Sequence, residues 1–218
     1  MVKINQTVYE GLRTGDLLLF DTRDTGWYGL IESTIKYLSH SSYSHIGMII
    51  KADSLGYKKL DKNKIYVWES GFEGTPDPQD GKIKLGVQIT QLDRIMNKYN
   101  GNLYIRKLDC DNLESQRIFN PTDLEKIHSQ IYGKPYDLNI VDWLCAFCRT
   151  DYKPQKIDSF WCSAFVGYVY TKLKILSSDT DWSILRPADF SAEDNNKHLT
   201  FQTNVILENK QYLLATSL

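Results

Sequence analysis

The sequence predicts a single α+β domain, residues 1–218, in which an antiparallel sheet packs against a helix that carries a cysteine. Segments 43–50 and 64–70 have the two-residue periodicity of strands and flank a polar loop, so they predict a hairpin. Segment 158–176 is apolar and has helical spacing. A chain of this length buries enough surface to hold a core without disulfides or metal. We therefore expect a mixed fold built around one core.

The composition is that of an ordinary globular protein, with 42% hydrophobic and 24% charged residues. The 26 Lys and Arg residues nearly balance the 27 Asp and Glu residues, so no strong basic field points to nucleic acid. No apolar run approaches the ~20 residues that span a bilayer, and segment 1–14 lacks the apolar run of a signal peptide. The four cysteines are sparse, which favours free thiols in a reducing compartment. We expect no nucleic-acid partner, no transmembrane segment, and a cytoplasmic location, or a virion location if the protein is viral.

The predicted sheet begins with segment 16–21, whose continuous apolar run is typical of a strand buried on both faces. Segments 43–50 and 64–70 follow as the two strands of the hairpin. Segments 86–90 and 102–108 have the composition of further strands. Alternation places two sets of side chains on common faces: His45, Gly47 and Ile49 in one strand, and Val67 with Glu69 in the next.

Helices are predicted in four segments. Residues 27–38 have apolar positions at 3.6-residue spacing, and residues 138–148 are apolar throughout much of their length. Thr122 begins a helix with capping-box form that Gly133 ends. The last helix covers 158–176, where Asp158 and Ser159 are both good N-cap residues. The Gly- and Pro-rich segment 71–81 is expected to be a surface loop.

Cys162 is the best candidate for a nucleophile, because it falls in the first turn of the predicted helix 158–176. The unpaired N–H groups and the positive end of the helix dipole favour the thiolate there. His45 is a candidate base, and Glu69, on the adjacent strand, a candidate to orient its ring. The alternatives remain open at this point: cysteine is often buried as a small hydrophobic residue, and a histidine in a strand often has only a structural role.

The motifs around these residues resemble a known family. In chain order they are 15–20 (GDLLLF), 43–48 (YSHIGM), 68–70 (WES), 133–137 (GKPYD), 160–163 (FWCS) and 186–190 (RPADF). This series is similar to the circularly permuted branch of the NlpC-type papain-like enzymes of bacteria and poxviruses, in which the His strand precedes the Cys helix. The resemblance spans about 15–190, nearly the whole domain. It implies a permuted papain-like fold with a groove between the sheet and a helix that bears the nucleophilic cysteine.

The resemblance also implies roles for individual residues. Cys162 would be the nucleophile, His45 the base and then the acid, and Glu69 the third member of the triad, with Glu73 as the alternative because the hairpin loop 51–63 is long. The Cys162 backbone N–H would contribute to the oxyanion hole. Ala164 departs from the family pattern, which often has an acidic residue there. Four motif neighbours are expected to contact substrate: Tyr43, Ser44, Trp161 and Ser163.

These expectations favour a thiol hydrolase, a cysteine peptidase or amidase, that acts on a small peptide, amide or acyl substrate through an acyl-enzyme. No cofactor or metal is expected. Two alternatives stay open: a lipid acyl hydrolase or acyltransferase with the same triad, and a catalytically silent binding or structural module, such as a viral particle component.

Other candidate sites are weaker. The Cys145-x-x-Cys148 pair has zinc or redox spacing, but it lies in a predicted helix and no second pair follows, so packing is the better interpretation. The acidic residues of segment 71–81 lack EF-hand spacing, which favours a solvated loop over a calcium site. The remaining histidines are expected in surface or cap roles: His40, His128 and His198.

Overall fold

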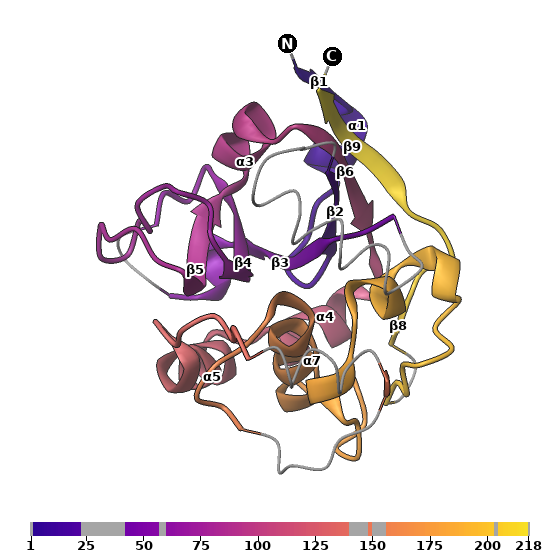
Figure 1. The fold of residues 1–218 in the computed structure, drawn as a ribbon. Coiled ribbons are helices and arrows are strands. Elements are labelled where there is room, and N and C mark those ends of the chain that lie inside the picture. The colour runs from indigo at the N-terminus through magenta and orange to yellow at the C-terminus, as the bar shows by residue number, and fades with distance from the viewer. Residues whose placement is uncertain are drawn as a thin grey trace.

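The computed structural model describes residues 2–22, 42–56, 60–139, 148–149, 156–202 and 205–217. The helix predicted for 27–38 lies outside these residues, and so does most of the helix predicted for 138–148. The rest of the expected architecture can be compared directly with the structure (Figure 1).

A seven-stranded antiparallel sheet forms the centre of the fold, in the order β1-β9-β6-β2-β3-β4-β5. Its strands are β1 Val2–Ile4, β2 Leu17–Thr22, β3 His45–Lys51, β4 Ile65–Gly71, β5 Gly86–Gln91, β6 Gly101–Arg106 and β9 Tyr212–Ser217. The short strands β7 Leu108–Asp109 and β8 Ile206–Leu207 pair separately. The predicted hairpin is confirmed, since β3 pairs with β4 in antiparallel orientation. The α+β class with an antiparallel sheet is therefore confirmed.

Helices cover both faces of this sheet. The α-helices are α1 Gln6–Glu10, α3 Leu92–Lys98, α4 Asn112–Ile118, α5 Pro121–Ile131 and α7 Cys162–Lys172. Single 3₁₀ turns are η1 Ala52–Ser54, η2 Trp182–Ile184, η3 Pro187–Phe190 and η4 Ala192–Asp194. Figure 1 shows α4, α5 and α7 gathered below the sheet, with α1 and α3 on its upper side. Buried residues accordingly form two clusters, a larger one that includes α5 and α7 and a smaller one that includes α1 and α3.

The side-chain alternation predicted for β3 is confirmed. Ile46 and Met48 belong to the larger cluster together with residues of α7, whereas Ile49 belongs to the smaller cluster with Val67. Because side chains alternate in a strand, His45 projects to the same side as Ile49. The helix α7 thus packs on the face opposite to the one from which His45 projects.

The predicted start of the last helix is wrong. Helix α7 begins at Cys162, later than Asp158 or Ser159, and ends at Lys172. The reason is a bridge to a distant segment: the Phe160 N–H donates to Pro135 O at 3.1 Å, and the Asp137 N–H donates to Phe160 O at 3.1 Å. These bonds hold the chain extended before the cysteine. Cys162 is consequently the first residue of the helix.

His128 also differs from the prediction, because it lies in the core and not at the surface. Only 2% of its surface is exposed, and its ring centroid lies 5.3 Å from that of Trp68 and 4.9 Å from that of Tyr132. Burial, assisted by the charge of Lys84, lowers the pKa of His128 from 6.5 to about 4. The folded protein therefore holds this imidazole neutral.

We expect His128 to make the free energy of unfolding depend on pH. Below pH 6.5 the unfolded chain binds a proton at this imidazole and the folded chain does not, until the pH reaches about 4. The stability present above pH 6.5 is therefore lost as the pH falls through this range, by up to ~3 kcal/mol. Urea unfolding of the wild type and of His128→Gln at several pH values measures the difference, and equal pH slopes would contradict the assignment.

Candidate active site

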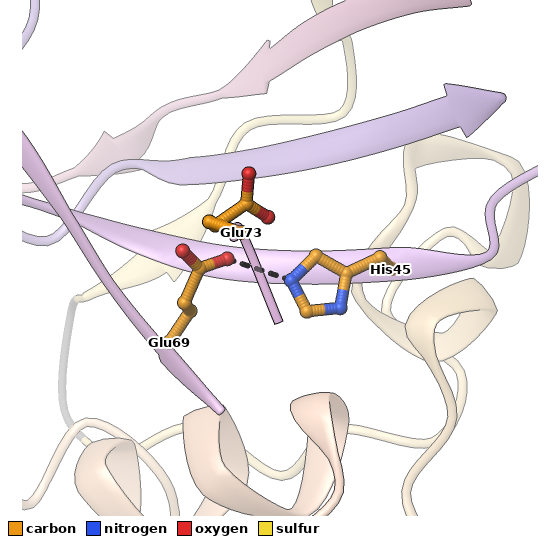
Figure 2. Close-up of side chains that lie close together, drawn as sticks. All are labelled: His45, Glu69 and Glu73. Carbon is orange, nitrogen blue, oxygen red and sulfur yellow. Dashed lines mark hydrogen bonds and ion pairs between the residues drawn. The ribbon is translucent and has the colours of Figure 1, made fainter. Parts of the chain in front are cut away.

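Three side chains from three separate elements meet at one end of the sheet. His45 is the first residue of β3, Glu69 lies near the end of β4, and Cys162 is the first residue of α7. The His45 Nε2 atom lies 2.7 Å from Glu69 Oε2 (Figure 2). Cys162 lies close enough to the same ring to raise its pKa. Since Nε2 faces Glu69, Nδ1 is the nitrogen left for the thiol.

Two glycines make room for the contact between His45 and Glu69. The paired register of β3 and β4 ends at Met48 with Trp68, beyond which Gly47 and His45 lie on β3 and Glu69 and Gly71 on β4. A Cβ atom on Gly71 would lie 2.9 Å from His45 Cε1, and a Cβ atom on Gly47 would lie 3.2 Å from Glu69 Cβ. The imidazole therefore occupies space that any other residue at position 71 would fill.

A hydrogen bond fixes the cysteine relative to the end of β4. The Ser70 hydroxyl donates to Phe160 O at 2.6 Å, and both groups are buried. This bond joins the residue next to Glu69 to the residue two positions before Cys162. It explains how a helix on one face of the sheet brings its thiol to an imidazole that projects from the other face.

The three residues of the site differ in their exposure to solvent. Glu69 is fully buried, Cys162 is 2% exposed, and the His45 side chain is 14% exposed. Burial lowers the pKa of His45, but the hydrogen bonds and charges of Cys162 and Glu69 outweigh it and hold that pKa well above 6.5. The arrangement therefore favours an imidazolium between two acidic partners.

The four residues expected to contact substrate have structural partners. Tyr43 is buried, and its hydroxyl accepts a hydrogen bond from the Gln211 amide. Buried Ser44 donates weakly to a backbone carbonyl, and buried Ser163 donates to Leu185 O at 2.7 Å. Trp161 is partly exposed, although its ring N–H also donates to Leu185 O. Of the four, only Trp161 keeps a partly accessible surface beside the thiol.

The structure distinguishes Glu69 from Glu73, which the sequence left as alternatives. Glu69 makes the short contact with His45, whereas Glu73 lies next to the pair, within 4.8 Å of one atom on each (Figure 2). Asp77 and Asp80, from the same loop, contact the Lys84 ammonium at 2.8 and 3.1 Å. These two acids therefore form an ion-pair network with Lys84.

A second polar cluster contains His198, Asp189, Asp194 and Arg149. His198 Nδ1 is 2.9 Å from Asp194 Oδ1 and 3.5 Å from Asp189 Oδ1, and Arg149 contacts Asp189 at 2.6 Å. His198 is partly exposed, as a surface role predicts, but it also contacts two acidic partners that the sequence did not predict. His40 and Cys145 lie outside the described residues, and Cys148 is exposed.

We expect Gly71→Ala to reduce turnover strongly while it changes the free energy of unfolding little. The added methyl group would displace the end of the His45 side chain, and a displacement of ~1 Å at a reacting group can cost ~10²-fold in rate. Gly81→Ala is the matched control: its φ of +74° makes alanine strained by about 1–2 kcal/mol, but the added atom meets nothing within 4 Å. Turnover and urea unfolding of both variants test this, and equal turnover would show that position 71 does not place the ring.

Gly71 and Ser70 are the functional positions that sequence reasoning missed. Ser70 directly follows Glu69 and Gly71 comes next, but a glycine after a predicted strand is usually taken as a turn signal. Their roles depend on the pairing register and on contact with Phe160.

Comparison with known proteins leaves the family open. No protein-family model matches the chain, and no curated protein matches its sequence. A solved structure similar to it is that of metalloprotein yiiX from Escherichia coli O157:H7, DUF1105, with 17% identity and a TM-score of 0.46 over 94% of this chain and 97% of that chain. Such a likeness identifies neither family nor activity, so the resemblance to permuted NlpC-type enzymes stays a prediction. Among the described residues, no helix is long and apolar enough to cross a membrane.

Proposed function

We propose that this protein is a thiol hydrolase in which Cys162 is the nucleophile, His45 the acid and base, and Glu69 the residue that orients the imidazole. The observation that carries this proposal is the 2.7 Å contact between the His45 ring and the buried Glu69 carboxylate, with Cys162 near enough to raise the pKa of the same ring. A nucleophile, a base and an orienting carboxylate in hydrogen-bond contact are what covalent acyl transfer requires. A permuted papain-like fold of the NlpC type accommodates this arrangement.

In the acylation step, the Cys162 sulfur attacks the substrate carbonyl carbon and a C–S bond forms. The raised pKa of His45 favours the imidazolium, which donates its proton to the leaving nitrogen or oxygen as the bond to the carbonyl carbon breaks. The buried Glu69 carboxylate stabilises the positive ring until that transfer. The product of this step is a thioester on Cys162.

In the deacylation step, neutral His45 takes a proton from water, and the resulting hydroxide attacks the thioester carbonyl. The C–S bond breaks, and the sulfur leaves as a thiolate beside the imidazolium. Developing charge on the carbonyl oxygen is stabilised at the start of α7, where the first N–H groups of a helix lack partners within the helix. Because Cys162 is the first helical residue, its own N–H is one of these groups.

A lipid acyl substrate is the second candidate, and the loop after Glu69 favours it. The segment between β4 and β5 exposes large apolar side chains: Phe72 is 45% exposed, Ile83 58% and Leu85 46%. An apolar surface of this kind suits an acyl chain better than a polar peptide. Faster hydrolysis of para-nitrophenyl esters with longer acyl chains, compared with aminoacyl para-nitroanilides, would favour the lipid substrate over the amide.

Thiol labelling tests the proposal without knowledge of the substrate. Exposure alone predicts that iodoacetamide modifies exposed Cys148 first, whereas an imidazolium–thiolate pair predicts that buried Cys162 reacts first. We expect the second result at neutral pH. Burial raises the pKa of Cys110, so that thiol should react slowest of the three. Peptide mass spectrometry after brief labelling measures the order.

The control is the same experiment on His45→Ala. Loss of the preference for Cys162 in that variant would tie the reactivity to the imidazole. If wild-type Cys162 reacts no faster than Cys110, the site is catalytically silent and the domain is a binding or structural module.

A further inference from the structure

We propose that His45, Glu69 and Glu73 form a binding site for a divalent transition-metal ion such as Zn²⁺, and that the bound ion inhibits the enzyme. The inhibition rests on the proposed thiol hydrolase function, whereas the binding does not. The ion would bind Nε2 of His45, the ring nitrogen on the side of Glu69, whereas Nδ1 faces the thiol. Because both nitrogens belong to one ring, His45 could not bind the ion and act as an acid and base at the same time.

The geometry supplies three ligand atoms in one place. One atom from each of His45, Glu69 and Glu73 lies within 4.8 Å of the other two. Figure 2 shows the two carboxylates and the imidazole side by side above the end of β4. The His45 atom that contacts Glu69 is Nε2, which is also a nitrogen that metal ions bind in histidine.

Two buried acceptor atoms, one within this cluster and one on the neighbouring strand, lack hydrogen-bond donors among the described residues. Glu69 and Gln88 face each other on β4 and β5, and both are fully buried. Glu69 Oε1 and Gln88 Oε1 have no hydrogen-bond partner among the described residues, although Gln88 Nε2 donates to Gly71 O at 2.8 Å. A buried acceptor without a donor destabilises the folded protein, and a cation or its bound water removes that penalty. Both observations are independent of the hydrogen bond between His45 and Glu69.

The donor set selects the kind of ion. One imidazole nitrogen and two carboxylates match the nitrogen and oxygen ligands that Zn²⁺ accepts in sites with three protein ligands. Ca²⁺ and Mg²⁺ favour sets made only of oxygen, so the imidazole disfavours them.

Binding of the ion would remove the acid–base function of His45. The metal–Nε2 bond replaces the Nε2–H bond of the imidazolium, and one proton is released to solvent. The ring then keeps its remaining proton on Nδ1, where it faces Cys162, and has no free electron pair with which to accept another. His45 can no longer shuttle a proton between the thiol and the substrate, so we expect turnover to fall by ~10²-fold at saturating ion.

Binding is tested directly with Co²⁺, whose absorption spectrum reports its ligands. The folded wild type and Cys162→Ser should both bind Co²⁺ with a visible spectrum of nitrogen and oxygen ligands and without a thiolate charge-transfer band. Glu73→Gln should weaken binding by at least ~10-fold, as expected for the loss of a metal-site group. Asp194→Asn is the matched control, because Asp189, Asp194 and His198 form the other candidate cluster among the described residues.

Inhibition is tested with Zn²⁺ and para-nitrophenyl acetate. Each variant is compared with its own rate in EDTA. Zn²⁺ should inhibit the wild type and Asp194→Asn reversibly, and Glu73→Gln should resist the same concentration.

Three results would overturn the inference: no Co²⁺ binding, binding that requires the Cys162 sulfur, or binding that Asp194→Asn abolishes. Binding without inhibition would overturn the regulatory part. If Zn²⁺ instead activates the enzyme and Cys162→Ala keeps that activity, the proposed thiol mechanism fails while the metal site stands.

Discussion

Cys162→Ala is expected to abolish turnover, with a loss of ~10⁴-fold or more in kcat, because removal of a covalent nucleophile leaves only binding and the oxyanion site. The fold should persist, since the change removes one sulfur atom from a position that already packs within the larger core. Initial rates with para-nitrophenyl acetate measure the effect, and circular dichroism with urea unfolding measures the fold.

Cys148→Ala is the matched control for this loss. Cys148 is an exposed thiol, so its removal should leave the rate within about 2-fold of wild type. Substantial turnover by folded Cys162→Ala would exclude the thioester mechanism. A Cys162→Ala protein that fails to fold would not decide the question, so Cys162→Ser, which keeps a polar atom of similar size, is measured beside it; rapid turnover by that variant would also exclude the mechanism.

Glu69→Gln is expected to reduce kcat by ~10³-fold or more, as does replacement of the orienting carboxylate in other triads. Glutamine keeps the shape of the side chain but removes the negative charge that stabilises the His45 imidazolium at 2.7 Å in a fully buried position. The pKa of His45 should fall toward its ordinary value, because one of the two acidic partners that raise it is lost. NMR titration of the His45 ring measures this shift separately from the rate.

Glu73→Gln tests which of the two acids, Glu69 or Glu73, orients the His45 ring, a choice that the sequence left open. Both lie near His45, and Glu69 makes a 2.7 Å contact with the His45 ring. We therefore expect a clearly smaller loss of kcat from Glu73→Gln, measured in EDTA. The opposite ranking would assign the third position of the triad to Glu73.

Local patterns predicted several parts of this molecule correctly. The central strands 16–21, 43–50, 64–70 and 86–90 overlap β2, β3, β4 and β5, because their apolar alternation records which side of each strand is buried. Alternation also placed His45 and Glu69 on one face. The predictions missed α3, α4, β1 and β9, whose short and partly exposed segments carry weak periodicity.

Local patterns were enough to predict the chemical groups of the site: a thiol in the first turn of a helix, an imidazole in a strand, and two carboxylates beyond the next hairpin loop. Which of these groups contact one another depends on how the strands and helices pack. The end of β4 places Gly71 against the His45 ring, and the Ser70 hydrogen bond to Phe160 ties the segment before Cys162 to the same strand. Ser70 and Phe160 are 90 positions apart, and such a contact depends on packing that no local pattern records.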